Sequence, residues 1–489
     1  MGWVEGALVR DGEASPLRVA TGGDANSGSK PVAAARLAIP NGAGSILGLG
    51  FACSTISAGA LDCDVDEKEI FATALGLTGT PWEVVEVTLD LTRTPGRLDI
   101  RLDFPPGTRF PRPSDGQLCT VYDTEEHSWR HMNFFQYECY LHAWVPRIDG
   151  RQPDGVKTVA VPWARPDTGF TLLMEAMMVL LSQTGMTVAE AGRTVAETPH
   201  RIWRVLFHHV KQAHEQIEVS EITQLTVDET SVRRGHNYVT VVCEPACVEE
   251  KRTTRVLFVA EGREATAVEQ ARTFLQEHGL PSTQVREVCA DMSLSYAKGV
   301  REQFPEARLV FDFFHVVQLL TTAVDAVRRR ESARFPGLLK GTRYLWLKNE
   351  ENLSEAQQEQ RRKLCRNNLQ TAKAHCHLAA FQDLLKAKEV EEAVGGLKWW
   401  YNWVCHSRIP EMIKVAKSIK AHWDGIVAYL ETRLTNAGAE AVNGLIQTAK
   451  RKARGFRSFV YFQTIIYLIG SKLKFDLPLS VPSYPPQTT

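Results

Sequence analysis

The sequence predicts an α/β fold in which one mixed sheet is combined with several groups of helices. Between residues 224 and 311, short runs of alternating apolar residues come in the order three strands, helix, strand, helix, strand. The first three strands are close enough in sequence to pair antiparallel, whereas the last two need helical crossovers. After Phe311 the pattern becomes helical as far as about residue 430. Before residue 224, a strand-rich segment is followed by a helical one.

Composition is that of an ordinary globular protein. The chain has 489 residues, of which 44% are hydrophobic and 23% charged, and at roughly one domain per 150 residues it is long enough for about three domains. No segment reaches the ~18 uncharged apolar residues of a membrane span. The N-terminus also lacks the order of a signal peptide. We therefore expect a cytoplasmic protein without membrane contacts.

The formal net charge is +0, but the charges are unevenly distributed. Residues 321–480 contain 27 Lys and Arg against 15 Asp and Glu, a net charge of +12, so the remainder carries −12. A basic C-terminal third could form a phosphate-binding surface. The alternative is a solvated helical surface that happens to be rich in lysine.

The ten cysteines are scattered and form no Cys-x-x-Cys pair, which favours reduced thiols. Cys243 and Cys247 flank a turn, but no second ligand pair for zinc is visible. His375, Cys376 and His377 are adjacent on an expected helix, where neighbours point about 100° apart, so they should not share one metal ion.

The segment before the helices is predicted to be a small β-rich module. Val84–Leu91 and Arg97–Phe104 alternate and are joined through Pro95-Gly96, which indicates a hairpin. Tyr137–Val145 is expected to be a further strand. Residues 1–65, rich in Gly, Ala and Ser, are expected to be poorly ordered.

Three helices should follow. Phe170–Gln183 is an apolar helix, and Thr187 with Glu190 matches a capping box at the start of the next. Thr198-Pro199 then supplies an N-cap and an N1 proline for a helix over His200–Gln212. The last two helices fit either a helix-turn-helix or an ordinary helical hairpin.

In a helix-turn-helix, the second helix would enter a groove of DNA. His200, Arg201 and Arg204 are the residues expected to face DNA in that case. Trp203, Leu206 and Phe207 are expected to belong to the core instead.

The core strands are expected at residues 224–228, 238–243, 256–260, 285–291 and 307–311. Arg263–His278 and Ser295–Phe304 should be the intervening helices, the first ending before Gly279. This element order is that of an RNase H-like fold.

Three carboxylates occupy distinctive positions in this arrangement. Asp228 and Asp291 end two of the predicted strands, and Glu440 lies near the start of a later helix. If they converge they could hold two divalent cations, Mg²⁺ or Mn²⁺, which suits phosphodiester chemistry. The alternative is a solvated acidic rim. Because 149 positions separate Asp291 from Glu440, far more than a loop needs, the segment between them should contain an inserted helical domain.

The helix that carries Glu440 also carries polar and basic residues. Asn443 and Gln447 share a face with Glu440, at spacings of three and seven residues. A run of cations follows, which could contact the phosphates that flank a cut or could be merely solvated. These cations are Lys450, Arg451, Lys452, Arg454 and Arg457. On the helix after the last strand, Asp312 and His315 are auxiliary candidates, His315 as a phosphate contact or as a buried structural histidine.

Several segments, taken in order, resemble the ISL3 family of bacterial insertion-sequence transposases. The resemblance runs from about residue 66 to about 475 and rests on Leu98–Pro105, Trp129–Phe135, Val161–Arg165, Val227–His236, Asp291–Arg301, Phe311–Val316, Arg433–Asn443, Arg451–Phe456 and Ile465–Ile469.

The resemblance implies an RNase H-like DDE domain in which Asp228, rather than its neighbour Glu229, joins Asp291 and Glu440 as a catalytic metal ligand. Asn443 is a further auxiliary candidate, and Arg234 is expected to contact DNA.

The family usually carries an N-terminal zinc ribbon with two Cys-x-x-Cys knuckles. Here residues 110–116 and 148–155, which would hold the knuckles, contain no cysteine. The sequence therefore gives little support for a structural zinc, although Asp115 and Cys119 could be remnants of such a site.

These observations predict a DNA transposase that binds element ends and target DNA as a homodimer or higher oligomer, in the bacterial cytoplasm near the nucleoid. A domesticated, inactive DNA-binding protein is the alternative, and a nuclease for RNA–DNA hybrids is a more distant one. The expected regions are an extension (1–65), a β-rich, degenerate zinc-ribbon-like module (66–166), the helix-turn-helix region (167–220), the first part of the catalytic core (221–318), a helical insertion (319–430), the helices that complete the core (431–475) and a tail (476–489).

Overall fold

The computed structural model describes residues 66–478, apart from 113–114, 151–154, 234–236, 246–252 and 263. The predictions for residues 1–65, Arg234, Cys247 and the end of the tail lie outside the described residues. Among the helices that are described, none is long and apolar enough to cross a bilayer.

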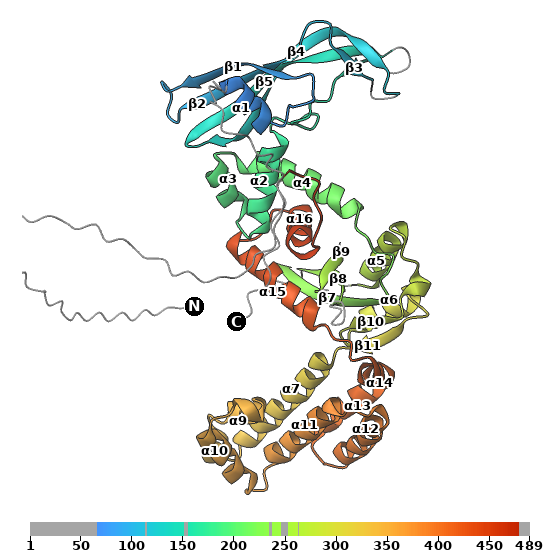
Figure 1. The fold of residues 1–489 in the computed structure, drawn as a ribbon. Helices are drawn as coiled ribbons and strands as arrows, with labels where there is room; N and C mark the ends of the chain where they lie inside the picture. The colour runs from blue at the N-terminus through green and yellow to red at the C-terminus, as the bar shows by residue number, and fades with distance from the viewer. Residues whose placement is uncertain are drawn as a thin grey trace, which may run out of the picture. The chain divides into compact units, whose positions relative to one another are not determined.

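The N-terminal module is a helix packed with a β-sheet (Figure 1). Its elements are α1 (Glu67–Ala74), β1 (Glu83–Asp90), β2 (Arg97–Asp103), β3 (Arg109–Pro111), β4 (Leu118–Phe134), β5 (Tyr137–Gly150) and β6 (Gly155–Thr158). The strand order is β1-β2-β5-β4-β3, with β6 on β5. The predicted hairpin is confirmed, because β1 and β2 pair antiparallel, and so is the strand at Tyr137–Val145.

Tryptophans form the centre of this module. The rings of Trp82 and Trp129 meet that of Trp163 edge-on, with centroids 4.9 and 5.5 Å away. Arg112 donates to Asp115 at 2.9 Å and to the sulfur of Cys119 at 3.4 Å. A guanidinium therefore joins the two residues that were considered as remnants of a zinc site.

The next three helices are α2 (Leu172–Gln183), α3 (Val188–Val195) and α4 (Pro199–Glu215). The expected capping box is present at Thr187 and Glu190. The turn between α3 and α4 is tight: Ala196 adopts a left-handed conformation with φ 56°, and a Cβ at Gly192 would lie 2.6 Å from the carbonyl of Glu197. The turn thus requires glycine in α3, where any larger residue would push the two helices apart.

The central sheet has the order β11-β10-β7-β8-β9. Its strands are β7 (Gln224–Arg233), β8 (Asn237–Glu244), β9 (Arg255–Glu261), β10 (Glu287–Ala290) and β11 (Arg308–Phe311). As expected, β7, β8 and β9 pair antiparallel, whereas β10 is parallel to both β7 and β11. The crossovers are α5 (Ala265–Glu277) and α6 (Leu294–Gln303).

A group of helices connects β11 to the last part of the chain. These helices are α7 (Phe313–Ser332), α8 (Pro336–Leu339), α9 (Arg343–Leu347), α10 (Glu355–Cys365), α11 (Gln370–Lys386), α12 (Val390–Cys405), α13 (Pro410–Ala421) and α14 (Trp423–Thr432). Trp346, Phe381 and Trp400 are buried in their core. Trp399, by contrast, is 61% exposed and stacks on Trp403 at the surface.

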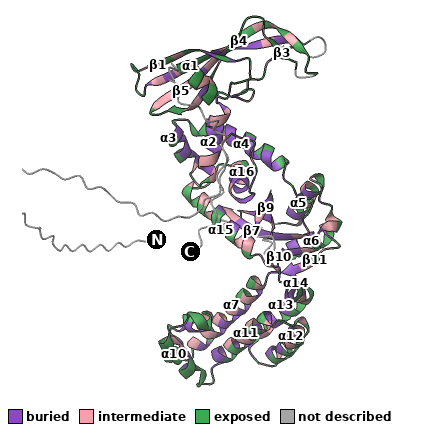
Figure 2. Ribbon diagram, viewed as in Figure 1, coloured by how far each residue is buried: buried purple, intermediate pink, exposed green. Residues whose placement is uncertain are grey.

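The chain returns to the sheet through α15 (Ala437–Lys452) and α16 (Phe459–Gly470). One hydrophobic core extends from α2, α3 and α4 through β8 and β9 to α15 and α16, and buried residues follow these elements in Figure 2. The helix-turn-helix region therefore shares its core with the sheet rather than having a core of its own.

Candidate active site and DNA-binding surface

Three aspartates follow one another across three neighbouring strands. The pairing register places Ala290 of β10 beside Val227 of β7 and Phe311 of β11. The residue that follows each of these is an aspartate: Asp228 lies inside β7, and Asp291 and Asp312 come directly after β10 and β11. Because these three strands are parallel, the register itself brings the three carboxyl groups to the same edge of the sheet.

Asp228 is buried and held at both oxygens. Its Oδ1 accepts from the backbone N–H of Glu229 at 2.8 Å, and its Oδ2 accepts from Asn443 Nδ2 at 2.8 Å. Burial is the main cause that raises the pKa of Asp228 to about 6; the nearby charges of Asp291 and Glu440 contribute to this rise, whereas the Glu229 hydrogen bond and His315 oppose it. Asp291 and Glu440 are thus close enough to Asp228 for their charges to act on it.

Asp291 and Glu440 are each half-buried. Asp291 Oδ1 accepts from the backbone N–H of Ser293 at 2.9 Å. Burial raises the pKa of Glu440, the charge of Asp312 adds to this, and His315 opposes it. Within the described ranges, no three His, Cys, Asp or Glu side chains stand close enough together to ligate a single ion.

Asp312 is buried and joins two parts of the site. Its Oδ1 accepts from the backbone N–H of Asn436, the residue before α15, at 3.3 Å. Its Oδ2 accepts from His315 Nδ1 at 3.1 Å. Asn436 in turn donates through Nδ2 to the carbonyl of Val227 at 3.3 Å. These contacts fix the start of α15 against the two strands that carry Asp228 and Asp312.

The structure gives His315 the hydrogen-bonded partner that one interpretation expected, and contact with a phosphate stays a prediction. The hydrogen bond to Asp312 is the largest effect on the pKa of His315 and raises it; burial opposes the shift, and the charges of Asp228 and Asp291 add to it. The side chain is only half-buried. His315 therefore has a structural partner, and its half-buried side chain lies near the carboxylates of Asp228 and Asp291.

The face of α15 that was predicted from spacing lies along β7. Asn443 binds Asp228, and Gln447 Nε2 donates to Thr230 Oγ1 at 2.6 Å and to the Ser231 carbonyl at 3.0 Å. Lys450 Nζ donates to the same carbonyl at 2.5 Å. Lys450, expected to contact DNA, is thus directed onto β7 in this structure.

The start of α15 is also in close contact with β9. A Cβ at Gly438 would lie 1.9 Å from Thr254 Oγ1, next to the first residue of β9. Only glycine allows the helix to begin this near the sheet. Glu440, two residues later, depends on this approach for its position.

The other predicted DNA contacts have different surroundings. Arg451, Arg454 and Arg457 are exposed. Lys452 is exposed as well, and its Nζ donates to the Gly185 carbonyl at 3.2 Å. His200 and Arg204 on α4 are also exposed.

Arg201, by contrast, is half-buried. It binds both carboxylate oxygens of Glu197, at 2.8 and 2.7 Å, and lies over the ring of Phe170. This guanidinium is engaged in the packing of its own domain.

Sequence reasoning missed Asn436 and Gly438. Both precede Glu440 directly, in the segment Thr435–Glu440. Neither has a side chain that suggests catalysis, and their roles depend on partners about two hundred positions away. The one local signal was an asparagine before a helix, which indicates a cap and not a link between strands.

The chemistry of the donor set fits a hard divalent cation. Asp228, Asp291 and Glu440 offer carboxylate oxygens, the ligands that Mg²⁺ and Mn²⁺ prefer. In addition, Asn443 Oδ1 is buried without a hydrogen-bond partner, beside the carboxylate that its own Nδ2 binds. A buried carbonyl oxygen without a donor is an acceptor that a cation or its water shell can satisfy.

Comparison with known proteins finds family models that match the helix-turn-helix region and the region that carries the carboxylates. A family model described as "Transposase", of the ISL3 DDE type, matches residues 225–466, and a second, "Helix-turn-helix domain of transposase family ISL3", matches residues 159–210.

The chain also resembles two transposases over most of their length. It is 28% identical to the transposase for insertion sequence element IS1557 of Mycobacterium tuberculosis, over 68% of this chain and 78% of that protein. It is 25% identical to the transposase for insertion sequence element IS1001 of Bordetella parapertussis, over 70% and 84%. With its helix-turn-helix for DNA binding and its DDE domain, the chain is a member of the ISL3 family of insertion-sequence transposases.

Proposed function

We propose that this transposase binds the terminal inverted repeats of its own insertion sequence and cuts DNA at the element ends. Hydrolysis of one phosphodiester releases a 3′-OH, which then attacks a phosphodiester of target DNA and joins the element to it. The observation that carries this proposal is the row of aspartates at one sheet edge, together with Glu440 in the first turn of α15, whose charge acts on Asp228.

The strand order supports an RNase H-like core. Three antiparallel strands are followed by two parallel ones on the far side of the first, which gives β11-β10-β7-β8-β9. On this proposal residues 319–430 are an insertion between the last strand and the helix that carries Glu440. Its hydrophobic cluster includes Cys289 and Val310 of the sheet, so the insertion would be supported by the core it interrupts.

Asp228, Asp291 and Glu440 are the residues that would hold two Mg²⁺ or Mn²⁺ ions. When bound, such ions activate the attacking oxygen and stabilise the leaving one. The protein's own part is to keep the ligands ionised and oriented. Asn443 and the Glu229 amide fix the two oxygens of Asp228, and with a pKa of about 6 this carboxyl is mostly charged at neutral pH.

His315 would contribute positive charge beside the reacting phosphate. Its Nδ1 is bound to Asp312, which leaves Nε2 for an oxygen of the DNA backbone. Asp312 acts through others: it positions His315 and, through Asn436, the start of α15. Assembly as a homodimer or higher oligomer on DNA remains a prediction.

The direct test is cleavage of a duplex that contains the end of the element, with Mg²⁺ or Mn²⁺. Removing one group that stabilises transition-state charge costs ~10²–10³-fold in rate, so Glu440→Gln should cut at least that much more slowly. Glu269→Gln, at an exposed position of α5, is the matched control and should cut normally. If Glu440→Gln cuts as fast as the parent, the site assignment is wrong.

A second outcome would separate the proposal from its alternative. Protection of end DNA in a footprint, without any metal-dependent nicking by the parent, would indicate a domesticated DNA-binding protein.

A further inference from the structure

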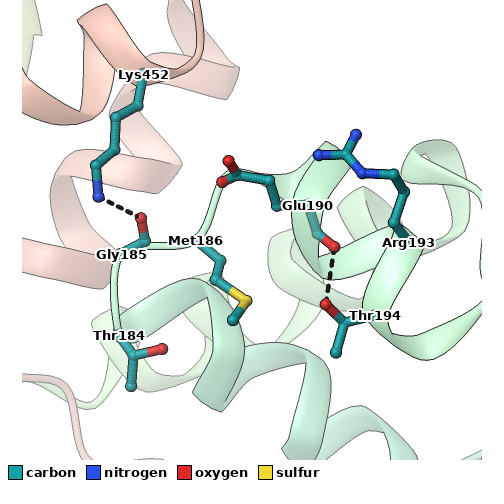
Figure 3. A pocket seen from close by; sticks show the side chains of 7 residues that line it. All are labelled: Thr184, Gly185, Met186, Glu190, Arg193, Thr194 and Lys452. Atoms are coloured by element: carbon teal, nitrogen blue, oxygen red, sulfur yellow. Dashed lines mark hydrogen bonds between the residues drawn. The ribbon is translucent and has the colours of Figure 1, made fainter. Parts of the chain in front are cut away.

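A cleft lies between the helix-turn-helix and the turn that follows α15. It has a volume of about 890 Å³ and is lined by residues of α3 and α4 on one side and by residues 449–469 on the other. We call it the α4–α15 cleft. Its floor is apolar and includes Trp203, Tyr461 and Ile465. An adjoining pocket of about 540 Å³ shares Gly185, Arg193 and Lys452 with it (Figure 3).

The rim of the cleft is strongly cationic. Arg193 and His200 come from the helix-turn-helix, and Lys452, Arg454 and Arg457 come from the opposite wall. All five are exposed. Glu190 is the one acidic residue among the described residues that line the cleft, and its carboxylate already accepts from the amide and hydroxyl of Thr187. The cleft therefore suits a ligand with repeated negative charges.

The two walls are fixed to each other. Lys452 Nζ donates to the Gly185 carbonyl (Figure 3), and the ring of Trp203 meets that of Tyr461 edge-on at 4.6 Å. Beneath them, α2, α3, α4, α15 and α16 share one hydrophobic core. The cations are thus held in a preformed arrangement, which lowers the entropic cost of binding.

We infer that the α4–α15 cleft binds the sugar–phosphate backbone of the same DNA end that α4 recognises. This inference rests on the proposed function. DNA is favoured over an acidic protein because one wall of the cleft is the start of α4, in the domain that binds DNA. Deoxyribose can lie on the apolar floor while its phosphates meet the cationic rim.

The position of the cleft on α15 gives it a second role. Glu440 lies in the first turn of this helix and Lys452 at its last residue, twelve residues later. At ~1.5 Å per residue this separation is about 18 Å. B-form DNA rises ~3.4 Å per base pair, so DNA that follows α15 would be held roughly five base pairs from the cut. The cleft would then set the distance between recognition and cleavage, within a single chain.

The test compares Arg454→Ala/Arg457→Ala with Arg286→Ala/Arg301→Ala, a control pair of exposed arginines that do not line the cleft. Binding to a duplex of the DNA that flanks the gene, and to a random-sequence duplex, is measured without divalent metal over a range of salt concentrations. Each lost phosphate contact should lower the slope of log K against log salt by about 0.9. We expect the cleft pair to lower the slope by nearly two on both duplexes, and the control pair to leave it unchanged.

Single methylphosphonate substitutions then locate the contacts. On the parent, neutral linkages about five base pairs from the cut should weaken binding, and the cleft variant should be insensitive to them. An unchanged salt slope, or a sensitive position elsewhere on the DNA, would overturn the inference. So would a cleft variant that changes self-association in sedimentation but not DNA binding, because the cleft would then be a contact between copies. Failure of the proposed function looks different, since the parent itself would not cut.

Discussion

The two ends of α15 are held in opposite ways. At its start, Asn436 is bound to Asp312 and Val227, and Gly438 is in contact with Thr254. At its end, Lys452 makes one hydrogen bond to a backbone carbonyl, and Arg454 and Arg457 in the following turn are exposed. The end that carries Glu440 is therefore fixed by the protein, whereas the basic end has side chains available for a partner. Four substitutions test this difference between the two ends of the helix.

The largest effect is expected from Asp228→Asn. Cleavage should fall by ~10³-fold or more, because a neutral amide replaces a metal-ligand carboxylate. The free energy of unfolding, by contrast, should rise. The folded-state pKa of about 6 lies above the usual value of 3.8, so the folded protein binds this proton more tightly, and stability is lost as pH rises through 6. In metal-free buffer at pH 7.5 the variant should be more stable by about 3 kcal/mol.

Unfolding of both proteins at pH 4.5 and pH 7.5, with EDTA, measures this effect. The stability gained by the variant should shrink toward the lower pH, where the parent's Asp228 is protonated. A variant that is less stable than the parent at pH 7.5 would show that this carboxylate is stabilised, not strained, by its surroundings.

Asp312→Ala should be next in size. It leaves the Asn436 amide without its partner at a buried position, which costs ~1–3 kcal/mol, and it removes the group that raises the pKa of His315. We expect the rate of cleavage to fall by roughly ten- to a hundredfold, as when a group that assists a reaction is lost. Binding to end DNA should be unchanged. Asp312→Asn keeps an acceptor for the amide and should recover stability but not the pKa of His315. If binding to end DNA fell by the same factor as cleavage, Asp312 would not be a positioning residue for the cleavage step.

Asn443→Ala should have a moderate, pH-dependent effect. It removes a hydrogen bond that favours the charged form of Asp228, so the pKa of Asp228 should rise above about 6. The acid limb of the pH–rate profile should shift to higher pH, and cleavage should be impaired more at pH 6.5 than at pH 8.5. A uniform loss at all pH values would mean that Asn443 acts in another way.

Gln447→Ala should be the mildest. Its hydrogen bonds to Thr230 and Ser231 are worth ~0.5–1.5 kcal/mol each, and they lie away from the carboxylates. The variant should unfold at a lower temperature than Gln270→Ala, an exposed control on α5, and should cut DNA at the parental rate. Slower cutting would indicate that the whole face of α15, and not its start alone, positions Glu440.

Much of the fold follows from local patterns. Every strand expected between residues 224 and 311 is present, with boundaries displaced by a few residues, because alternation and turn residues are encoded within each strand. The aspartate row also has a local origin: each aspartate directly follows a buried apolar run, and parallel pairing aligns them. Sequence alone therefore placed Asp291 at a strand end, but the strand expected to end at Asp228 continues to Arg233.

The contacts that complete the site are long-range and could not be predicted. Asn443 and Asp228 are 215 positions apart, and Asn436 and Asp312 are 124 apart. Local patterns also cannot separate residues of the same type. Lys450 and Arg451 are adjacent cations, yet one is bound to β7 and the other is exposed. Trp399 and Trp400 likewise differ only in the side of α12 on which they lie.

Gly438 determines how closely helix α15 can approach Thr254. A Cβ added at Gly438 would lie 1.9 Å from Thr254 Oγ1, so a methyl group there would have to displace either the helix or Thr254. A helix of this length transmits such a displacement to its far end. We therefore expect a methyl group at Gly438 to change two dimensions at once, the reach of Glu440 toward the aspartates and the width of the α4–α15 cleft. Gly438→Ala adds one carbon atom and should therefore alter both the cleavage of DNA and its binding in the cleft.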